Sequence, residues 1–359
     1  MDFPSLKIGN LVSRIPVIQG GMGVGISLAG LASAVANEGG IGIIAAAMIG
    51  IDEPDVTANP AEANVRALKR EIRKARELTD GIIGVNIMVA MTHYGDLVRA
   101  SIEEGVDMII SGAGLPMDLP GYLSDGAKTK LVPIVSSARA AKLICQKWLG
   151  KYNYLPDAFV VEGPKAGGHL GVKRDHVDNP DYAVDRILKE VIDTVKPFAD
   201  ARGAVIPVIA AGGIYTGGDI SEMLNLGAAG VQMGTRFVGT YECDAEAGFK
   251  EAYLNAKKEN LVIIKSPVGL PGRAISNLFL DEVESGGKKP FKCPYQCIKT
   301  CDVDNSPYCI ALALAGAKKG KFKNGFAFAG SNAYRVKKII SVKELFRSLQ
   351  LEYDEAFCA

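Results

Sequence analysis

Eight short runs of apolar residues rich in Ile and Val recur along the chain, with helix-like segments between them. The runs are nearly continuous in apolar residues, which is the pattern of strands that are buried on both faces. Such strands belong to parallel sheets, because helices then cover both faces of the sheet. The runs occupy residues 15–19, 40–45, 82–87, 107–112, 131–136, 158–163, 206–212 and 230–234.

Eight strand–helix units predict an α/β fold of the (β/α)8 TIM barrel type. The segments 64–78 and 219–227 have the apolar spacing of amphipathic helices. Within 103–107 and 225–230, glycine stands where a helix would end before the next strand. A doubly wound sheet is the competing architecture, and the count of eight favours the barrel.

The strand–helix rhythm stops near residue 255, so we expect residues 1–255 to form the barrel. Residues 256–330 hold a glycine–lysine turn and four cysteines without that rhythm, which indicates a cap or insertion. Residues 331–359 are expected to close on the barrel with a helix around 341–350.

Charge and hydropathy argue against several classes of partner. The 359 residues include 41 Lys and Arg against 40 Asp and Glu, and this net charge of +1 gives no electrostatic case for binding nucleic acid or an anionic membrane. No apolar run reaches the roughly 18 residues of a membrane helix, and the chain does not open on an apolar signal segment. We therefore expect a soluble cytoplasmic protein.

Glycines follow the predicted strand ends with regularity. In a barrel of this type the chemistry gathers at the C-terminal ends of the strands. Two late loops, 210–217 and 233–237, combine small residues with a following helix, and bare backbone N–H groups there form a phosphate cradle. No GxGxxG fingerprint of a dinucleotide site is present. The pattern predicts a cofactor with one phosphate, and flavin mononucleotide (FMN) is the first candidate.

Four of the seven cysteines crowd into one short stretch with the spacing C-x3-C-x3-C-x7-C. They are Cys293, Cys297, Cys301 and Cys309. Four thiolates hold either a tetrahedral zinc ion or a 4Fe–4S cluster. Structural zinc prefers two short knuckles separated by a longer span, so this spacing favours the 4Fe–4S cluster, with zinc as the alternative.

Taken together, the motifs QGGMGVGIS, GVNIM, SGAGLP, EGPKAGGHLG, IPVIAAGGI and GVQMGTRF resemble the nitronate monooxygenase family of FMN barrels. This family was formerly called 2-nitropropane dioxygenase and includes the enoyl-ACP reductase II enzymes. The resemblance runs from about residue 10 to residue 243. KSPVGLPGRAI, the cysteine stretch and GFAFAGSNAYRVKKIISVKEL are similar to a narrower iron–sulfur branch, which acts as a decanoyl-ACP dehydrogenase/isomerase in fatty-acid synthesis.

The resemblance implies a role for each matching position. His169 matches the catalytic base of the family. Asn86 would hydrogen-bond to the flavin ring. The other cofactor-binding positions are Gln19, Gly20, Gly21 and Met22 against the ring, Glu162, Gly167 and Gly168 along the ring and ribityl chain, and Gly212, Gly213, Gly234 and Thr235 around the phosphate.

His169 is one of only three histidines, and it stands behind two glycines and ahead of a third. Imidazole has an unperturbed pKa close to neutral pH, as a general base requires. The glycines would let the backbone pass close beneath the flavin, so that His169 takes the proton α to an activating group while flavin N5 accepts hydride or electrons. Taken alone, a lone histidine is more often a turn residue, and its setting reverses that preference. His93 and His176 lie in polar contexts and are expected to be structural or surface residues.

Three functions fit these features. The first is oxidation and isomerisation of a medium-chain acyl-ACP thioester, the second is oxidation of alkyl nitronates by O2, and the third is a flavin and iron–sulfur redox sensor. Reduction of the flavin by NAD(P)H would indicate the enoyl-ACP reductase reaction.

The cysteines favour the acyl-ACP function, for which an acidic acyl carrier protein would need a basic surface. Lys288, Lys289, Lys292, Lys299 and the run 318–323 offer one, although a charge run is more often a solvated face. A homodimer is one option for the assembly.

Overall fold

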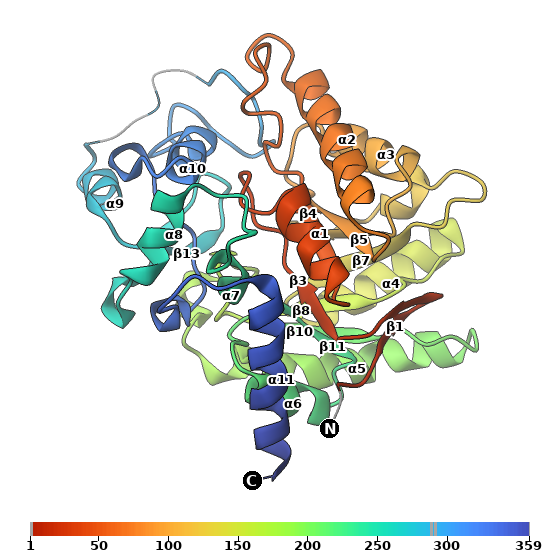
Figure 1. Ribbon diagram of the computed structural model, residues 1–359. Helices are drawn as coiled ribbons and strands as arrows, with labels where there is room; N and C mark the ends of the chain where they lie inside the picture. Colours follow the sequence, from red (N-terminus) through yellow and green to blue (C-terminus); the bar gives the residue numbers. More distant parts are fainter. Residues whose placement is uncertain (1–2, 288–289, 291–292, 359) are drawn as a thin grey trace.

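Eight parallel strands form a closed barrel in the computed structural model, which describes residues 3–287, 290 and 293–358 (Figure 1). The strand order is β3-β11-β10-β8-β7-β6-β5-β4, and a parallel bridge between Ile18 and Ile41 joins the two ends of the sheet. The strands are β3 (Val17–Gln19), β4 (Gly42–Ala45), β5 (Ile83–Met88), β6 (Met108–Gly112), β7 (Lys130–Val135), β8 (Phe159–Glu162), β10 (Val208–Ala211) and β11 (Gly230–Met233). The TIM-barrel prediction is confirmed, and the closure excludes a doubly wound sheet.

Both faces of the strands are buried, which explains their continuous apolar sequences. Ile43, Ile110 and Ile209 fill the inside of the barrel, together with Leu6 of the hairpin formed by β1 (Leu6–Ile8) and β2 (Leu11–Ser13). The outer faces pack on a ring of helices, which are α1 (Ala29–Asn37), α2 (Pro60–Leu78), α3 (Tyr94–Glu103), α4 (Ala138–Tyr152), α5 (Val184–Asp200) and α6 (Gly217–Asn225). No helix of the described part of the chain is long and apolar enough to cross a membrane.

The barrel departs from the ideal repeat in two places. Residues 113–129 between β6 and β7 hold only a 3₁₀ turn (Leu119–Tyr122), because Pro116, Pro120 and Gly121 do not sustain an α-helix there. After β11, α7 (Thr235–Val238) is a single turn. The helical layer is completed instead by α11 (Val342–Cys358), which packs on α6 and α1 (Figure 1).

The segment after the barrel strands builds a second layer over the C-terminal ends of those strands. It contains α8 (Ala247–Leu254), β12 (Leu261–Lys265), β13 (Pro271–Ile275), α9 (Leu278–Glu284) and α10 (Ile310–Lys318). A short strand from the loop after β8, namely β9 (Gly168–His169), adds to β13 and makes a three-stranded sheet. This pairing ties the barrel loop that carries His169 to the segment that the sequence marks as a cap. The boundaries at residues 255 and 330 stay predictions.

The close packing of α6 on α11 predicts different effects for two neighbouring glycine substitutions. A Cβ added at Gly217 would overlap the backbone of Leu349 and Tyr353 in α11, whereas one at Gly218 would be 3.7 Å from its nearest atom. We expect Gly217→Ala to lower the free energy of unfolding by about 1–3 kcal/mol, the usual cost of overpacking. Gly218→Ala is the control and should change it by less than about 1 kcal/mol. Urea unfolding of both variants measures the difference, and equal midpoints would contradict this packing.

Candidate active site

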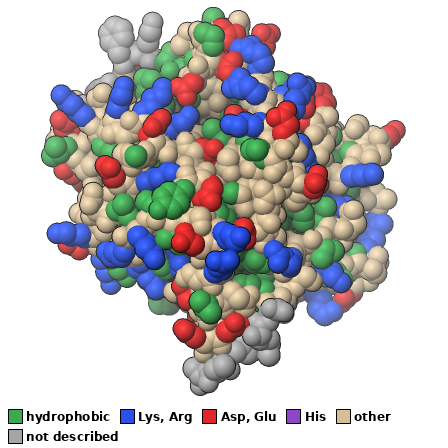
Figure 2. Space-filling view, in the orientation of Figure 1, with side chains coloured by type: hydrophobic (Ala, Val, Ile, Leu, Met, Phe, Trp, Pro, Cys, Tyr) green, Lys and Arg blue, Asp and Glu red, His purple; other side chains and the backbone are tan. Residues whose placement is uncertain are grey.

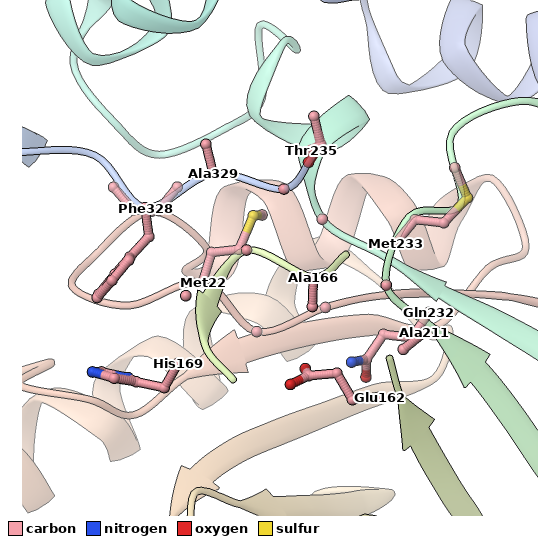
Figure 3. A pocket seen from close by; sticks show the side chains of 18 of the residues that line it. Met22, Glu162, Ala166, His169, Ala211, Gln232, Met233, Thr235, Phe328 and Ala329 are labelled. Carbon is pink, nitrogen blue, oxygen red and sulfur yellow. The ribbon is translucent and has the colours of Figure 1, made fainter. Parts of the chain in front are cut away.

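One cavity lies at the C-terminal ends of the barrel strands, beneath the cap, and most of the predicted site residues line it (Figure 3). Its walls come from the loops after β3, β8, β10 and β11, from β5 and β6, and from the segment around residue 330. The predicted residues that line it are Gly20, Gly21, Met22, Asn86, Glu162, Gly167, Gly168, His169, Gly212, Gly213, Gly234 and Thr235. The structure therefore brings together residues that are far apart in the sequence.

Gln19 is the exception among the predicted cofactor-binding residues, because it does not line the cavity. Its side chain is fully buried in the barrel, where Nε2 donates to the carbonyl of Gly20 and Oε1 accepts from the N–H of Ile43 at 3.0 Å. Gln19 therefore supports the start of the loop at Gly20, and its position does not match the predicted packing on a flavin ring. A glutamine at a strand end is as well suited to this bracing as to binding a ligand, which the sequence alone does not distinguish.

Bare backbone forms the part of the cavity where the sequence predicts a phosphate. Gly212 and Gly213 have φ values of 92° and 89°, a conformation that glycine adopts without strain. A Cβ at Gly212 would lie 2.7 Å from the carbonyl oxygen of Gly163, and one at Gly213 would lie 2.9 Å from the Cβ of Lys165. Any larger residue at these positions would fill or distort the wall, so this part of the cavity fits a phosphate held by backbone N–H groups.

Residues 329–332 complete the same part of the cavity from the cap side, and the sequence interpretation missed them. The N–H of Ser331 donates to the carbonyl of Lys165 at 3.1 Å, and Asn332 Nδ2 donates to the carbonyl of Gly213 at 2.7 Å. A Cβ at Gly167 would lie 2.6 Å from the backbone of Ala329. The signal that could have identified this segment is its small-residue run AGSN, which resembles the other cavity loops.

His169 is held on its backbone, its ring face and one ring nitrogen. Its backbone lies in β9 and pairs with Gly272 of β13, and its ring packs against Phe328 with the centroids 4.9 Å apart. Nε2 is 2.7 Å from the hydroxyl of Ser266, which lies on the turn between β12 and β13. Burial lowers the pKa of His169 from 6.5 to about 4, so the imidazole is neutral at neutral pH.

Glu162 shares the cavity with His169, and its pKa is shifted in the opposite direction. Burial raises the pKa of its carboxyl group to about 8, so Glu162 carries a proton at neutral pH. Gln232 lines the same cavity, and Figure 3 shows both side chains there. The Oε1 atom of Gln232 is buried and has no hydrogen-bond partner in the described part of the chain. Gln232 is another lining residue that the sequence interpretation missed, because its strand reads as a barrel core strand.

The four cysteines of the cap line a separate cavity of about 370 Å³. The N–H of Gln296 donates to Cys293 Sγ at 3.2 Å, and burial with repulsion from the neighbouring thiols raises the pKa of Cys297 to about 12. Within residues 3–287, 290 and 293–358, no three metal-ligating side chains converge on a single point. The structure thus gathers the predicted ligands around one space without showing a site for a single ion.

The other predicted residues fall into two groups. His93 lies half-buried with Nδ1 3.7 Å from Asp96, and His176 stacks on Tyr182 with the ring centroids 4.4 Å apart, and neither lines the cavity that contains His169. Of the lysines named for a carrier protein, Lys288, Lys289 and Lys292 lie outside the described residues.

The comparisons with known proteins agree with this fold. A model of the nitronate monooxygenase family matches residues 5–352. A Mycobacterium tuberculosis enzyme, (3aS,4S,5R,7aS)-5-hydroxy-7a-methyl-1-oxo-octahydro-1H-indene-4-carboxyl-CoA dehydrogenase, is 32% identical over 76% of this chain. That alignment spans 66% of the dehydrogenase, slightly less than two thirds of its length. A probable nitronate monooxygenase of Staphylococcus aureus is 28% identical over 75% of this chain and 77% of its own.

Two solved structures share the architecture. FabK from Thermotoga maritima superposes with a TM-score of 0.72 at 28% identity, over 95% of this chain and 93% of FabK. A nitroalkane oxidase from Streptomyces ansochromogenes gives a TM-score of 0.72 at 22% identity, over 96% of this chain and 97% of its own. The second similarity concerns the fold alone.

The lowered pKa of His169 predicts a pH dependence of stability. The folded protein keeps His169 neutral down to about pH 4, whereas an unfolded histidine gains a proton below about 6.5. The stabilisation is therefore present above pH 6.5 and is lost as the pH falls toward 4. Urea unfolding of the wild type and of His169→Gln should show the wild type losing more free energy of unfolding over that range. At pH 8 both the histidine and the glutamine are neutral. If the difference in free energy of unfolding between the two proteins still changed with pH above pH 8, the lowered pKa of His169 would not be its cause.

Proposed function

Because the chain belongs to the nitronate monooxygenase family of oxidoreductases, we propose that it is an FMN-dependent enzyme that dehydrogenates a medium-chain acyl thioester and then shifts the new double bond. The observation that carries the proposal is the position of His169. Its imidazole is neutral at neutral pH and lines the glycine-walled cavity at the strand ends. A neutral imidazole in such a place is equipped to take a proton from a substrate carbon.

The cavity fits FMN by the shape of its backbone. Gly212, Gly213, Gly234 and Thr235 would hold the phosphate, with Asn332 supporting the loop at Gly213. A Cβ at Gly21 would overlap the side chain of Asn86, so the loop after β3 comes as close to β5 as glycine permits. Bound FMN would supply the acceptor for the two electrons that leave the substrate with hydride.

The protein's own part in the reaction is proton movement. The thioester carbonyl acidifies the α carbon, and the unprotonated nitrogen of His169 takes a proton from it. For the isomerisation, His169 first releases the α proton to solvent, then takes a proton from the γ carbon of the unsaturated product and returns it to the α carbon, which moves the double bond by one position. The proton transfers of the isomerisation therefore leave His169 neutral again.

A thioester substrate is supported by the M. tuberculosis relative, whose name describes a dehydrogenase of a carboxyl-CoA thioester. Acyl carrier protein remains the proposed carrier, and its acidic surface needs cations. Lys318 and Lys319 are both paired with Asp52, at 3.1 and 2.6 Å, so they offer little to a partner. Lys321 and Lys323 are exposed. Lys and Arg lie interspersed with Asp and Glu over the face in Figure 2, so a contact on this face would be local.

We propose a 4Fe–4S cluster for the cysteine cavity. A zinc ion needs its ligands to converge at about 2.3 Å from one point, whereas a cluster spreads its four thiolates over a larger volume. The four cysteines surround about 370 Å³ without converging, and the N–H of Gln296 points at Cys293 Sγ as donors do around cluster thiolates. These features support the cluster over zinc.

Nitronate oxidation is the second candidate, and the family match and the S. aureus relative favour it. It uses the same base, because His169 would again face the carbon next to an activating group. Reduction of an enoyl thioester by NAD(P)H is the third, because of the similarity to FabK. The cysteine cavity of the cap favours the acyl-thioester function, because nitronate oxidation does not require such a cavity.

One experiment separates these functions. The purified protein, loaded with FMN, is mixed anaerobically with decanoyl-ACP, propyl nitronate, NADH or NADPH, and loss of the flavin absorbance is recorded. Stoichiometric bleaching by decanoyl-ACP is the expected result. Bleaching by propyl nitronate alone would establish the second candidate, and bleaching by NADH or NADPH alone would establish the third.

Removal of the base predicts a loss of turnover without loss of cofactor. His169→Ala should keep its FMN and reduce the rate of flavin bleaching about 10²- to 10⁴-fold, because proton abstraction then lacks its acceptor. His176→Ala, which alters a histidine outside the cavity, is the matched control and should react like the wild type. An unchanged rate in His169→Ala would exclude His169 as the base.

The cluster proposal predicts the metal content. Anaerobically purified protein should contain about four iron atoms and four sulfides per chain. Cys297→Ser should lose most of them while the FMN content, which depends on the other cavity, stays close to that of the wild type. Stoichiometric zinc in place of iron would refute the proposal.

A further inference from the structure

A hydrogen-bond network connects the cysteine segment to His169, and it lies outside the residues assigned above. Thr300, next to Cys301, donates from Oγ1 to the carbonyl of Val268 at 3.1 Å. The N–H of Val268 donates to Ser266 Oγ at 3.2 Å, and Ser266 Oγ is 2.7 Å from His169 Nε2. We call Thr300, Val268 and Ser266 the His169 network.

We propose that Ser266 is a positioning residue that fixes the tautomer and orientation of His169, and that Thr300 makes this positioning depend on the cysteine segment. The inference rests on the proposed role of His169 as the base. It assigns a task to a serine and a threonine that are 97 and 131 residues further along the chain than the histidine.

Ser266 is built into a rigid turn. Its N–H donates to the carbonyl of Leu270 at 3.3 Å, and the N–H of Gly269 donates to its carbonyl at 3.0 Å, so the turn between β12 and β13 is closed from both sides. The residue is only 3% exposed. A hydroxyl group this buried and this constrained has few alternative partners, and the ring of His169 is therefore held by it.

The contact also decides which ring nitrogen reacts. Nε2 is occupied by Ser266, so Nδ1 is the nitrogen left to meet a substrate in the cavity. To act as a base, Nδ1 must be unprotonated, and the single proton of the neutral ring is then on Nε2. Nε2–H donates to Ser266 Oγ, whose second lone pair accepts the N–H of Val268. When Nδ1 accepts the substrate proton, Ser266 keeps its hydrogen bond to Nε2–H and supports the imidazolium.

Thr300 connects the positioning of His169 to the cysteine segment through Val268, which is hydrogen-bonded to both Thr300 and Ser266. Val268 receives a hydrogen bond at its carbonyl from Thr300 and gives one at its N–H to Ser266. Val268 is 6% exposed and Ser266 3%, so water does not readily replace the hydrogen bond between them, whereas Thr300 lies at the exposed end of the network. A shift of the backbone at Thr300 and Cys301 would therefore move Val268, and with it the hydroxyl that holds His169.

The test of Ser266 uses FMN-loaded full-length protein and two readouts. Ser266→Ala should lower the limiting rate of flavin bleaching by decanoyl-ACP about 10-fold or more, with its apparent Kd changed less than about 3-fold, as expected when a base loses its orienting partner. Ser266→Thr retains a hydroxyl group and should recover most of the rate. An equal loss of rate in the Ala and Thr variants would overturn the assignment, because the loss would then come from packing.

The second readout is independent of turnover. With only three histidines in the chain, side-chain ¹⁵N spectra of histidine-labelled protein are simple, and the His169→Ala variant identifies the signals of His169. We expect His169 with its proton on Nε2 in the wild type and a mixture of both tautomers in Ser266→Ala. A proton found on Nδ1 in the wild type would overturn the assignment.

Thr300→Val tests the link to the cysteine segment, because it removes the hydroxyl group while keeping the shape of the side chain. We expect a displaced His169 signal and a several-fold slower bleaching rate at unchanged iron and FMN content. Ser285→Ala removes an exposed hydroxyl on the same cap that donates to the carbonyl of Glu282 in its own helix; it is the matched control and should change neither. Wild-type spectra and rates in Thr300→Val would reject the link.

Failure of the network and failure of the proposed function give different results. If His169→Ala reacts normally, the base assignment fails and the network loses its purpose. If His169→Ala is inactive but Ser266→Ala matches the wild type in rate and in tautomer, only the network is wrong.

Discussion

The pairing of β9 with β13 is the contact on which the site depends. Gly168 and His169 come from a barrel loop, yet they form the third strand of a sheet whose other two strands belong to the cap. Because His169 pairs with Gly272 through its backbone, the position of the proposed base is set by the cap and the barrel together. The cap is thus part of the site's construction, and both Phe328 and Ser266 reach the histidine from it.

The barrel could be predicted from the sequence because the burial of each strand restricts the residue types of that strand alone. Burial on both faces imposes a continuous apolar run such as Val208–Ala211 that is visible in the sequence without knowledge of its neighbours. The glycines of the phosphate region are similar, since a positive φ at Gly212 and Gly213 restricts the residue type directly. Where a constraint acts on one residue at a time, the sequence records it.

The rest of the site depends on neighbours that only the fold supplies. Ser266 lies in a turn that looks like any hairpin turn, and its role follows from a contact 97 residues away. Gln19 ends a strand that leads into the cavity, but the register of β3 against β4 turns it toward Ile43 and away from the cavity. The AGSN run at 329–332 needed the chain to fold back over Gly167 before it formed a wall. In each case the residue type permits several roles, and tertiary contacts select one.

Burial shifts the pKa values of Glu162 and His169 in opposite directions, and both shifts favour the neutral form. Glu162 with a pKa of about 8 is protonated at neutral pH, and His169 with a pKa of about 4 is not, so the two cannot form an ion pair. Lys165 is the only Lys or Arg among the described residues that line the cavity, and it is exposed. A proton arriving at His169 therefore creates a side-chain charge among buried residues that are otherwise neutral. The hydrogen bond to Ser266 is placed to stabilise that charge, and the neutral Glu162 does not compete for the proton.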